Sequence, residues 1–422
     1  QYNMILNGDS TNLQSLSNLP LWMVEGMAEY LSIGSIDAHT AMWMRDAVLN
    51  DDIPTLDDLN NPKYFPYRYG QVFWAFLTGL KGDEIIEPFF KGVAKYGFEE
   101  ASKRVLGMTK DDLSKLWVDG FRRHFGAAFD TTATTDRLVG RELIGTENGG
   151  RMNVAPEISP NGRYVIFLSE KDLFSIDLFL ANSREFAFVA FSKGRNILVV
   201  KDVESGKTVR ELRPDGLQAF SNPDWSPDGK HFVVTGLDHG ETDLYLIDAR
   251  SGEVEQLTDD AYSEMHPKWA ENGNQIVFST DRLARERGRT NGRWAFNLAT
   301  FDMASLRAED IDVFPGADNL NPVFDTTGNI IFLSNRDGFR NIYEPYSQKV
   351  FQLTDLITGV SGITHYAPAI SIAQRRNRVL YTYFSQNGYR IYRARPIDFL
   401  DKEVDPSEVN FEAAQLPRFN KM

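Results

Sequence analysis

The sequence predicts a multidomain protein in which a helical domain is followed by an all-β domain, a six-bladed β-propeller. Two observations support this fold class. Up to about residue 130 the apolar residues recur at the spacing of amphipathic helices, and beyond Arg151 they alternate with polar residues in segments that repeat. The 422 residues, 42% of them hydrophobic, are enough to form more than one core.

The helical domain is expected over residues 1–130, and its clearest helix lies in the stretch LPLWMVEGMAEYLS, residues 19–32. Apolar residues between Leu21 and Leu31 trace one broad helical face. Pro20 suits the first turn of this helix, because proline lacks the backbone N–H that would have no partner there. The same spacing predicts further helices at residues 69–80, 84–97 and 110–125.

Two features of this first helix should weaken it. Glu25 and Glu29 are four residues apart, a spacing at which like charges repel by a few tenths of a kcal/mol. Gly26, between them, costs roughly 1 kcal/mol relative to alanine in a helix interior. A cation or a closely packed neighbour would compensate for these costs.

The segments that flank the repeats have no apolar period of their own. Residues 131–150 are rich in threonine and glycine, so we expect a linker or a first strand that leads into the next domain. Residues 401–422 follow the last repeat and are expected to form a C-terminal tail.

The all-β domain is expected over residues 151–400, where one pattern returns several times. A proline, a short strand, a polar turn and an alternating apolar strand follow one another, and in several copies a second hairpin comes next. Four strands per copy are the unit of a propeller blade. The clearest copies are APEISPNGRYVIFLS at 155–169, NPDWSPDGKHFVVTG at 222–236 and HPKWAENGNQIVFST at 266–280, and weaker copies occupy 321–334 and 367–385.

The spacing of the first proline in each copy predicts the number of blades. Pro223, Pro267, Pro322 and Pro368 are separated by 44, 55 and 46 residues, the length of one blade each. Pro156 precedes Pro223 by 67 residues, which is too long for one blade and too short for two. We therefore expect a second blade that is incomplete near residues 182–184, and six blades in all.

The repeats resemble the TolB-like six-bladed β-propeller family. The WSPDGK segment, Trp225–Lys230, and its related copies carry this resemblance over more than half of the chain. It implies a propeller that binds proteins, peptides or small ligands, or that shields a neighbouring active site.

The segment WMVEGMAEY, residues 22–30, resembles the glutamate-bearing helix of gluzincin (peptidase MA-like) metallopeptidases. In that family an upstream H-E-x-x-H helix supplies two zinc ligands and the catalytic base. The resemblance implies that Glu25 is the third zinc ligand and that Glu29 orients a metal-bound histidine. Gly26 would let the helices of the metal site approach closely. The segment YRYGQVFWAFL, residues 67–77, is similar to the active-site helix of the family, which implies that Tyr69 helps to stabilise a tetrahedral intermediate.

The H-E-x-x-H pair is absent from this sequence, whose six histidines include no two that are four residues apart. Zinc is therefore expected only if such a segment precedes Gln1, since the histidines hold the metal and the glutamate between them deprotonates water. Without a metal, Glu25 and Glu29 are solvated carboxylates on a helix face, and Tyr69 is a core residue.

Two functions remain open from the sequence. The first is an exported zinc-dependent metallopeptidase of gluzincin type, whose propeller recruits or screens a polypeptide substrate. The alternative is a catalytically inactive binding or scaffold protein of the cell envelope that acts on protein partners through its propeller. The resemblance implies a periplasmic, outer-membrane-associated or secreted location.

Composition excludes several other classes. The formal net charge of −14 argues against nucleic acid as a partner. No apolar run of about 18 residues is present, so no membrane span is expected. The chain has no cysteine, which excludes disulfides and thiolate metal sites.

Overall fold

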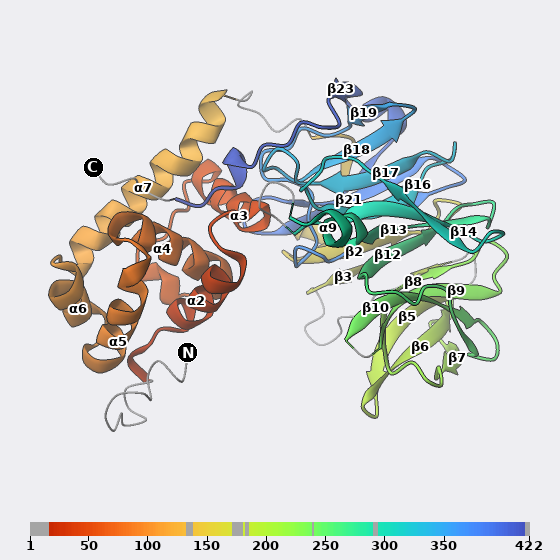
Figure 1. The fold of residues 1–422 in the computed structure, drawn as a ribbon, viewed down its shortest axis with the longest axis horizontal. Helices are drawn as coiled ribbons and strands as arrows, with labels where there is room; N and C mark the ends of the chain where they lie inside the picture. Colours follow the sequence, from red (N-terminus) through yellow and green to blue (C-terminus); the bar gives the residue numbers. More distant parts are fainter. Residues whose placement is uncertain are drawn as a thin grey trace. The chain divides into compact units, whose positions relative to one another are not determined.

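The chain divides into two units. The computed structural model describes residues 17–131, 138–170, 180–181, 185–238, 240–289 and 294–417. The helical unit comprises Gln1–Thr135 together with Phe411–Met422, and the β unit comprises Asp136–Asn410 (Figure 1). The prediction of a helical region followed by a β-propeller is confirmed. Among the described residues, no helix has both the length and the apolar character needed to cross a lipid bilayer.

The described part of the helical unit consists of helices and short helical turns. Gly34, Gly82 and Gly97 each follow a helix with positive φ, and the N–H of each glycine caps a carbonyl of the last turn. The elements are α2 (Leu21–Ile33), α3 (Ala38–Leu49), η2 (Asp58–Asn60), α4 (Pro66–Lys81), η3 (Asp83–Ile85), α5 (Ile86–Tyr96), α6 (Phe98–Ala101), the π-helical turn η4 (Ser102–Leu106) and α7 (Lys110–Thr131).

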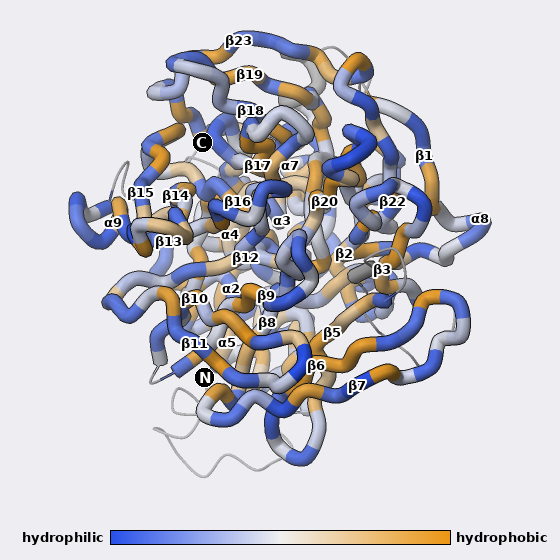
Figure 2. The backbone as a smooth tube through the Cα atoms, turned by 90° about the vertical axis from the view of Figure 1, so that its right-hand side faces the viewer, coloured by the Kyte–Doolittle hydropathy of each residue, from blue (hydrophilic) through white to orange (hydrophobic). Residues whose placement is uncertain are grey.

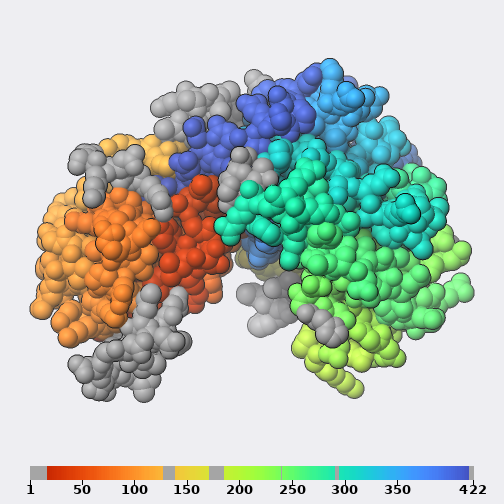
Figure 3. All heavy atoms as spheres, viewed as in Figure 1, coloured from red at the N-terminus to blue at the C-terminus, as the bar shows by residue number. Residues whose placement is uncertain are grey.

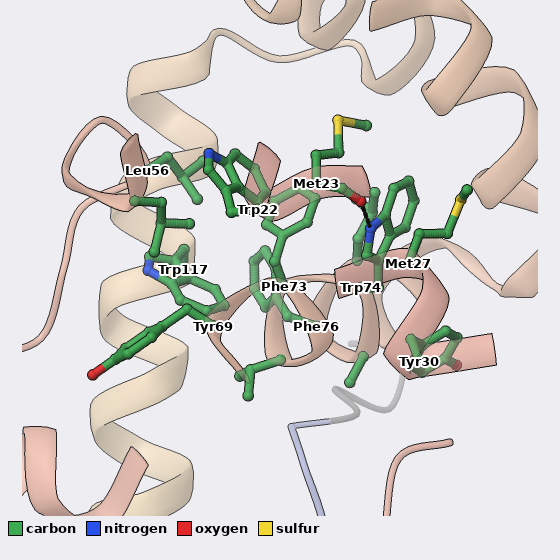
Figure 4. Close-up of a cluster of buried hydrophobic side chains, with 14 of the residues drawn as sticks. Trp22, Met23, Met27, Tyr30, Leu56, Tyr69, Phe73, Trp74, Phe76 and Trp117 are labelled. Atoms are coloured by element: carbon green, nitrogen blue, oxygen red, sulfur yellow. Dashed lines mark hydrogen bonds between the residues drawn. The ribbon is translucent and has the colours of Figure 1, made fainter. Parts of the chain in front are cut away.

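One continuous core of aromatic and aliphatic side chains holds these helices together. Phe73 of α4 lies at its centre, with ring centroids 4.9 Å from Trp22 and 6.2 Å from Trp117 (Figure 4). The indole N–H of Trp74 donates to the carbonyl of Met23 at 2.9 Å. The buried face of α2 therefore packs against α4, as the apolar spacing requires.

The interior glycine of α2 is explained by this packing. A Cβ atom built on Gly26 would lie 2.1 Å from the backbone carbon of Gly70 in α4, and one built on Gly70 would lie 1.9 Å from the carbonyl oxygen of Trp22. Only glycine at both positions lets the two backbones touch. The close contact of α2 with α4 therefore compensates for the unfavourable helix propensity of Gly26.

The β unit is built from antiparallel sheets. Hydrophobic stretches run along strands such as β5 and β6 (Figure 2). Three sheets of four strands follow one another along the chain: the first contains β4 (Leu180–Ala181), β5 (Glu185–Ser192), β6 (Arg195–Asp202) and β7 (Thr208–Leu212), the second β8 (Ala219–Trp225), β9 (His231–Asp238), β10 (Glu241–Asp248) and β11 (Val254–Gln256), and the third β12 (Glu264–Trp269), β13 (Gln275–Thr280), β14 (Asn297–Asp302) and β15 (Arg307–Ile311). A five-stranded sheet contains β16 (Asn319–Phe324), β17 (Ile330–Ser334), β18 (Asn341–Tyr346), β19 (Lys349–Gln352) and β23 (Lys402–Val404), and another four-stranded sheet contains β1 (Arg141–Ile144), β22 (Tyr389–Ala394), β21 (Arg378–Phe384) and β20 (Ile370–Ala373). A two-stranded sheet contains β2 (Asn153–Ile158) and β3 (Val165–Ser169).

The prediction of six blades is wrong in number. The described residues form five blades of four or five strands and one separate two-stranded sheet, β2–β3. Within the described ranges, the first repeat forms the hairpin β2–β3 as a sheet of its own, and the next described strands belong to the sheet β4–β7. The gap predicted near residues 182–184 lies outside the described residues.

Segments distant in sequence complete two of the blades. Strand β1 pairs with β22 and so adds an N-terminal strand to the blade made by the last repeat. Residues 138–150, assigned from the sequence to a linker or a first strand, contain β1 and the short helix α8 (Thr146–Gly149). Strand β23, which lies in the segment expected to be a tail, adds a fifth strand beside β19. These additions cover strand edges that would otherwise be unpaired.

The short helices outside these sheets are α9 (Arg282–Arg287), η5 (Pro396–Asp398) and η6 (Glu412–Ala414). The first two lie in the β unit, whereas η6 belongs to the helical unit. The chain therefore returns to the helical unit after the last blade.

Candidate functional sites

Five polar residues meet beside the contact between α2 and α4, and we call them the carboxylate cluster: Glu25, Glu29, Asp37, Tyr67 and Arg68. Nη1 of Arg68 lies 3.5 Å from Oε2 of Glu29 and 3.5 Å from Oδ2 of Asp37. Tyr67 forms a hydrogen bond with Glu25. The two glutamates that the sequence singled out are half-buried, and Arg68 is almost fully buried.

The cluster has an excess of negative charge, because it contains three carboxylates and one guanidinium. The charge of Glu25, followed by burial, raises the pKa of Tyr67 above its ordinary value, which keeps the phenol protonated. The ion pair between Arg68 and Glu29 offsets part of the repulsion that the spacing of Glu25 and Glu29 predicts. This corner of the helical unit therefore favours a cationic or hydrogen-bond-donating ligand.

Asp37 connects the cluster to the start of α3. Its side chain accepts hydrogen bonds from the backbone N–H of His39 at 3.0 Å and from the hydroxyl of Thr40 at 2.7 Å, as an N-cap aspartate does. The same carboxylate faces Arg68. The position of the guanidinium thus depends on the loop that ends α2 and begins α3.

Tyr69 and Tyr67 occupy different environments on α4. Tyr69 is buried, with its ring 5.2 Å from that of Tyr64 in an edge-to-face contact, and burial raises its pKa well above the ordinary value. Its hydroxyl points away from the labelled residues of α2 (Figure 4). Tyr67 is the tyrosine beside Glu25. Sequence reasoning did not single out Tyr67, because the face of α4 that meets α2 follows from the glycine contact rather than from the residue pattern.

The described residues do not by themselves fit a zinc site. No group of three histidine, cysteine, aspartate or glutamate side chains among them could hold a metal ion. Glu25 and Glu29 would supply carboxylate oxygens, whereas the imidazole ligands typical of catalytic zinc would have to come from outside the described part of the chain.

The β unit has a pocket of about 370 Å³ where inner strands from different sheets converge, and we call it the central pocket. Charged and apolar side chains both line it. Among them are Glu157 of β2, Asp224 of β8, Lys268 and Trp269 of β12, Ser371 of β20, and Arg375, which follows β20.

Lys268 of β12 forms ion pairs with residues of two other strands, β2 and β8. Its Nζ lies 2.5 Å from Oε1 of Glu157 and 3.2 Å from Oδ1 of Asp224. Burial lowers the pKa of Lys268, but the charges of Asp224 and Glu157 outweigh burial and raise the pKa above its ordinary value. Ser371 donates to Oε2 of Glu157 at 2.6 Å, and the backbone N–H of Trp269 donates to Oδ2 of Asp224 at 2.8 Å. These residues of the pocket lining therefore form one network of ion pairs and hydrogen bonds.

A repeated bulge explains why these side chains reach the pocket. In β2, β8, β12 and β16 the strand register shifts at the repeat proline, and the residue before the proline has a positive φ. The extra residue turns the strand so that the side chain after the proline faces the pocket. The residues with positive φ are Ala155, Asn222, His266 and Asn321, with φ between 50° and 57°.

The repeat prolines also line a smaller cavity of about 30 Å³. Pro223, Pro267, Pro322 and Pro368 contribute to its wall together with His266. Burial lowers the pKa of His266 to about 4, so the imidazole is neutral at physiological pH, and its Nε2 lies 2.6 Å from the carbonyl oxygen of Tyr366.

Comparison with known proteins identifies the kind of propeller. Residues 178–287 match the family model described as the TolB beta propeller domain. This match supports a TolB-like β-propeller domain in the β unit. A curated relative, the uncharacterized protein Atu1656 of Agrobacterium fabrum, is 28% identical over 151 residues, which cover 31% of this chain and 52% of that protein. The chain thus spans about half the length of this curated relative.

Several solved structures are similar to the chain. TolB from Acinetobacter baumannii has 18% sequence identity and a TM-score of 0.40, with 53% of each chain covered. The putative TolB from Agrobacterium tumefaciens has 16% identity and a TM-score of 0.38, covering 56% of this chain and 71% of that chain. The β-propeller domain of the Trilobed protease from Pyrococcus furiosus has 14% identity and a TM-score of 0.39, covering 62% and 82%. The gluzincin resemblance of the helical unit rests on its sequence motif alone.

Proposed function

We propose that this chain is a cell-envelope protein that binds a polypeptide partner in the central pocket of its propeller. The observation that carries the proposal is the convergence of charged and aromatic side chains from separate sheets on one pocket. A pocket of about 370 Å³ falls in the usual range for ligand sites. The envelope location is inferred from the TolB-like propeller.

The lining of the pocket favours a polypeptide over other ligands. Trp225 and Trp269 offer apolar surface, while Asp228 and Arg375 offer charges of both signs at the same pocket. A peptide presents apolar side chains, amide groups and charged ends within a short length, and aromatic and arginine residues are enriched where proteins bind one another. The net charge of −14 disfavours polyanions such as nucleic acid.

A random peptide library displayed on phage and selected on the purified chain tests this proposal. Peptides that bind should lose at least tenfold in affinity for Arg375→Glu, because this exposed arginine lines the pocket. Arg395→Glu is the matched control, since Arg395 is also an exposed arginine in an ion pair but does not line the pocket. Equal binding of the peptides to both variants would contradict a role for the central pocket.

A second candidate is the zinc-dependent metallopeptidase of gluzincin type, exported and with the propeller recruiting or screening its polypeptide substrate. The observation that favours it is the position of Glu25 and Glu29 together, half-buried, beside the α2–α4 contact, with Tyr67 hydrogen-bonded to Glu25. In this proposal Glu25 is the third zinc ligand and Glu29 orients a histidine, while Tyr67 takes the role that the resemblance implied for Tyr69, the stabilisation of a tetrahedral intermediate. The zinc and both histidine ligands would depend on an H-E-x-x-H segment outside this sequence.

Elemental analysis of zinc in the purified protein, combined with its intact mass, tests the second candidate. About one zinc per chain, lost in Glu25→Gln but kept in Glu87→Gln, would support it. Glu87 is a suitable control because it lies exposed on α5 in an ion pair with Lys91. Absence of zinc from a protein with the mass of this chain would reject the metallopeptidase and leave the binding function.

A further inference from the structure

The end of the chain is built into the helical unit. The backbone N–H of Leu416 donates to the carbonyl of Ser35 at 2.8 Å, and the N–H of Asp37 donates to the carbonyl of Ala414 at 2.9 Å. These two bonds flank a bridge between Ile36 and Gln415. The chain after the propeller thus pairs, in a strand-like manner, with the loop between α2 and α3.

Side chains reinforce this pairing from both sides. Arg45 of α3 is fully buried, and its Nη1 donates to the carbonyl of Ala413 at 2.6 Å. Nε2 of His124 on α7 lies 2.6 Å from the carbonyl oxygen of Gln415, and since a carbonyl can only accept, Nε2 carries the proton. Burial lowers the pKa of His124, which keeps the ring neutral at physiological pH.

The segment also contributes to the core. Leu416 is 1% exposed and belongs to the same apolar cluster as Phe73 and Trp117. The heavy atoms are drawn in Figure 3, where the first helices are red and the C-terminal residues are blue. A tail that lay on the surface would leave Leu416 exposed, and its backbone carbonyls would not accept a hydrogen bond from a buried guanidinium such as that of Arg45.

We propose that residues 411–417 form a strap that completes the helical unit and fixes the carboxylate cluster. The strap binds the backbone of Asp37, the side chain of Asp37 faces Arg68, and Arg68 faces Glu29. The loop that orients the cluster is therefore held by the far end of the chain. The helical unit reaches its final geometry only after the propeller has been synthesised. This inference does not depend on either proposed function.

Hydrogen–deuterium exchange on the whole chain and on a chain that ends at Asn410 tests the strap. Without the strap, amides of residues 33–46 should exchange at least tenfold faster, while those of β8–β10 should be unchanged. A synthetic peptide of residues 408–419 added to the shortened chain should restore protection. Unchanged exchange in residues 33–46 after truncation would overturn the proposal.

A point variant settles the question if the shortened chain does not fold. Leu416→Ala keeps every backbone bond of the strap but removes its buried side chain, so the melting temperature of the helical unit should fall by about 10 °C, with faster exchange in residues 33–46. Leu21→Ala is the control, because Leu21 is 62% exposed on α2. Equal behaviour of Leu416→Ala and Leu21→Ala would overturn the strap.

Discussion

The helical unit and the propeller differ in how their buried residues are arranged. The described helices share one continuous apolar cluster that centres on the contact of α2 with α4. The propeller distributes its apolar residues over several smaller clusters, and its inner strands meet at a network of charged side chains. The stability of the helical unit is therefore expected to depend most on a close backbone contact, and that of the propeller on a set of buried charges.

The largest effect is expected at the centre of the propeller. Lys268→Met would leave the carboxylates of Glu157 and Asp224 without their cation, which should cost about 3–5 kcal/mol in the free energy of unfolding. Lys349→Met, which removes an exposed ion pair with Glu403, should change it by no more than about 0.5 kcal/mol. Denaturant unfolding of both variants measures the difference. Similar values for the two lysines would show that the central network does not hold the inner strands together.

A comparable effect is expected at the helical contact. Gly26→Ala places a Cβ 2.1 Å from the backbone of Gly70, so α2 and α4 must separate, and we expect a loss of about 3 kcal/mol. Gly126→Ala in α7 is the matched control, because a Cβ there meets no atom within 4 Å and alanine should stabilise the helix by about 0.5–1 kcal/mol. Thermal unfolding followed by circular dichroism compares them. Tolerance of Gly26→Ala would mean that the contact is looser than described.

The smallest effect, taken per pH unit, concerns a buried carboxyl group of the propeller. Burial raises the pKa of Glu264 from 4.5 to about 8, and Thr258 donates a hydrogen bond to its Oε2. Because the folded pKa exceeds the unfolded one, the group stabilises the fold most below pH 4.5. This contribution falls as the pH rises to about 8. Removing one titrating proton should flatten the pH dependence by up to about 1 kcal/mol per pH unit.

Unfolding of Glu264→Gln between pH 5 and 8 measures this slope against that of the unchanged chain. Glu309→Gln, at an exposed position of β15, should leave the slope as it is. An unchanged slope in Glu264→Gln would indicate that water or structural relaxation stabilises the ionised carboxylate, so that folding does not raise its pKa.

The sequence by itself determined the two classes of structure and their order. Apolar spacing predicted α2, α4 and α7, because burying one face of a helix requires that spacing wherever the partner lies. The recurring proline and turn predicted the inner strands and the TolB-like propeller, since each repeat folds its hairpin locally. Glu25 and Glu29 were selected from the sequence as candidate site residues, and their roles remain predictions.

Only the tertiary structure decided which distant segments meet. Gly26 is needed because Gly70 lies opposite it, and Tyr67 rather than Tyr69 lies beside Glu25, which a single helix pattern cannot specify. The number of complete blades depended on how the strands after the first repeat pair, and spacing alone does not determine pairing. The sequence offered a first strand within residues 131–150 as one alternative, but not its pairing of β1 with β22. It did not predict the strap at 411–417, because the partners of that segment lie hundreds of residues away in the chain.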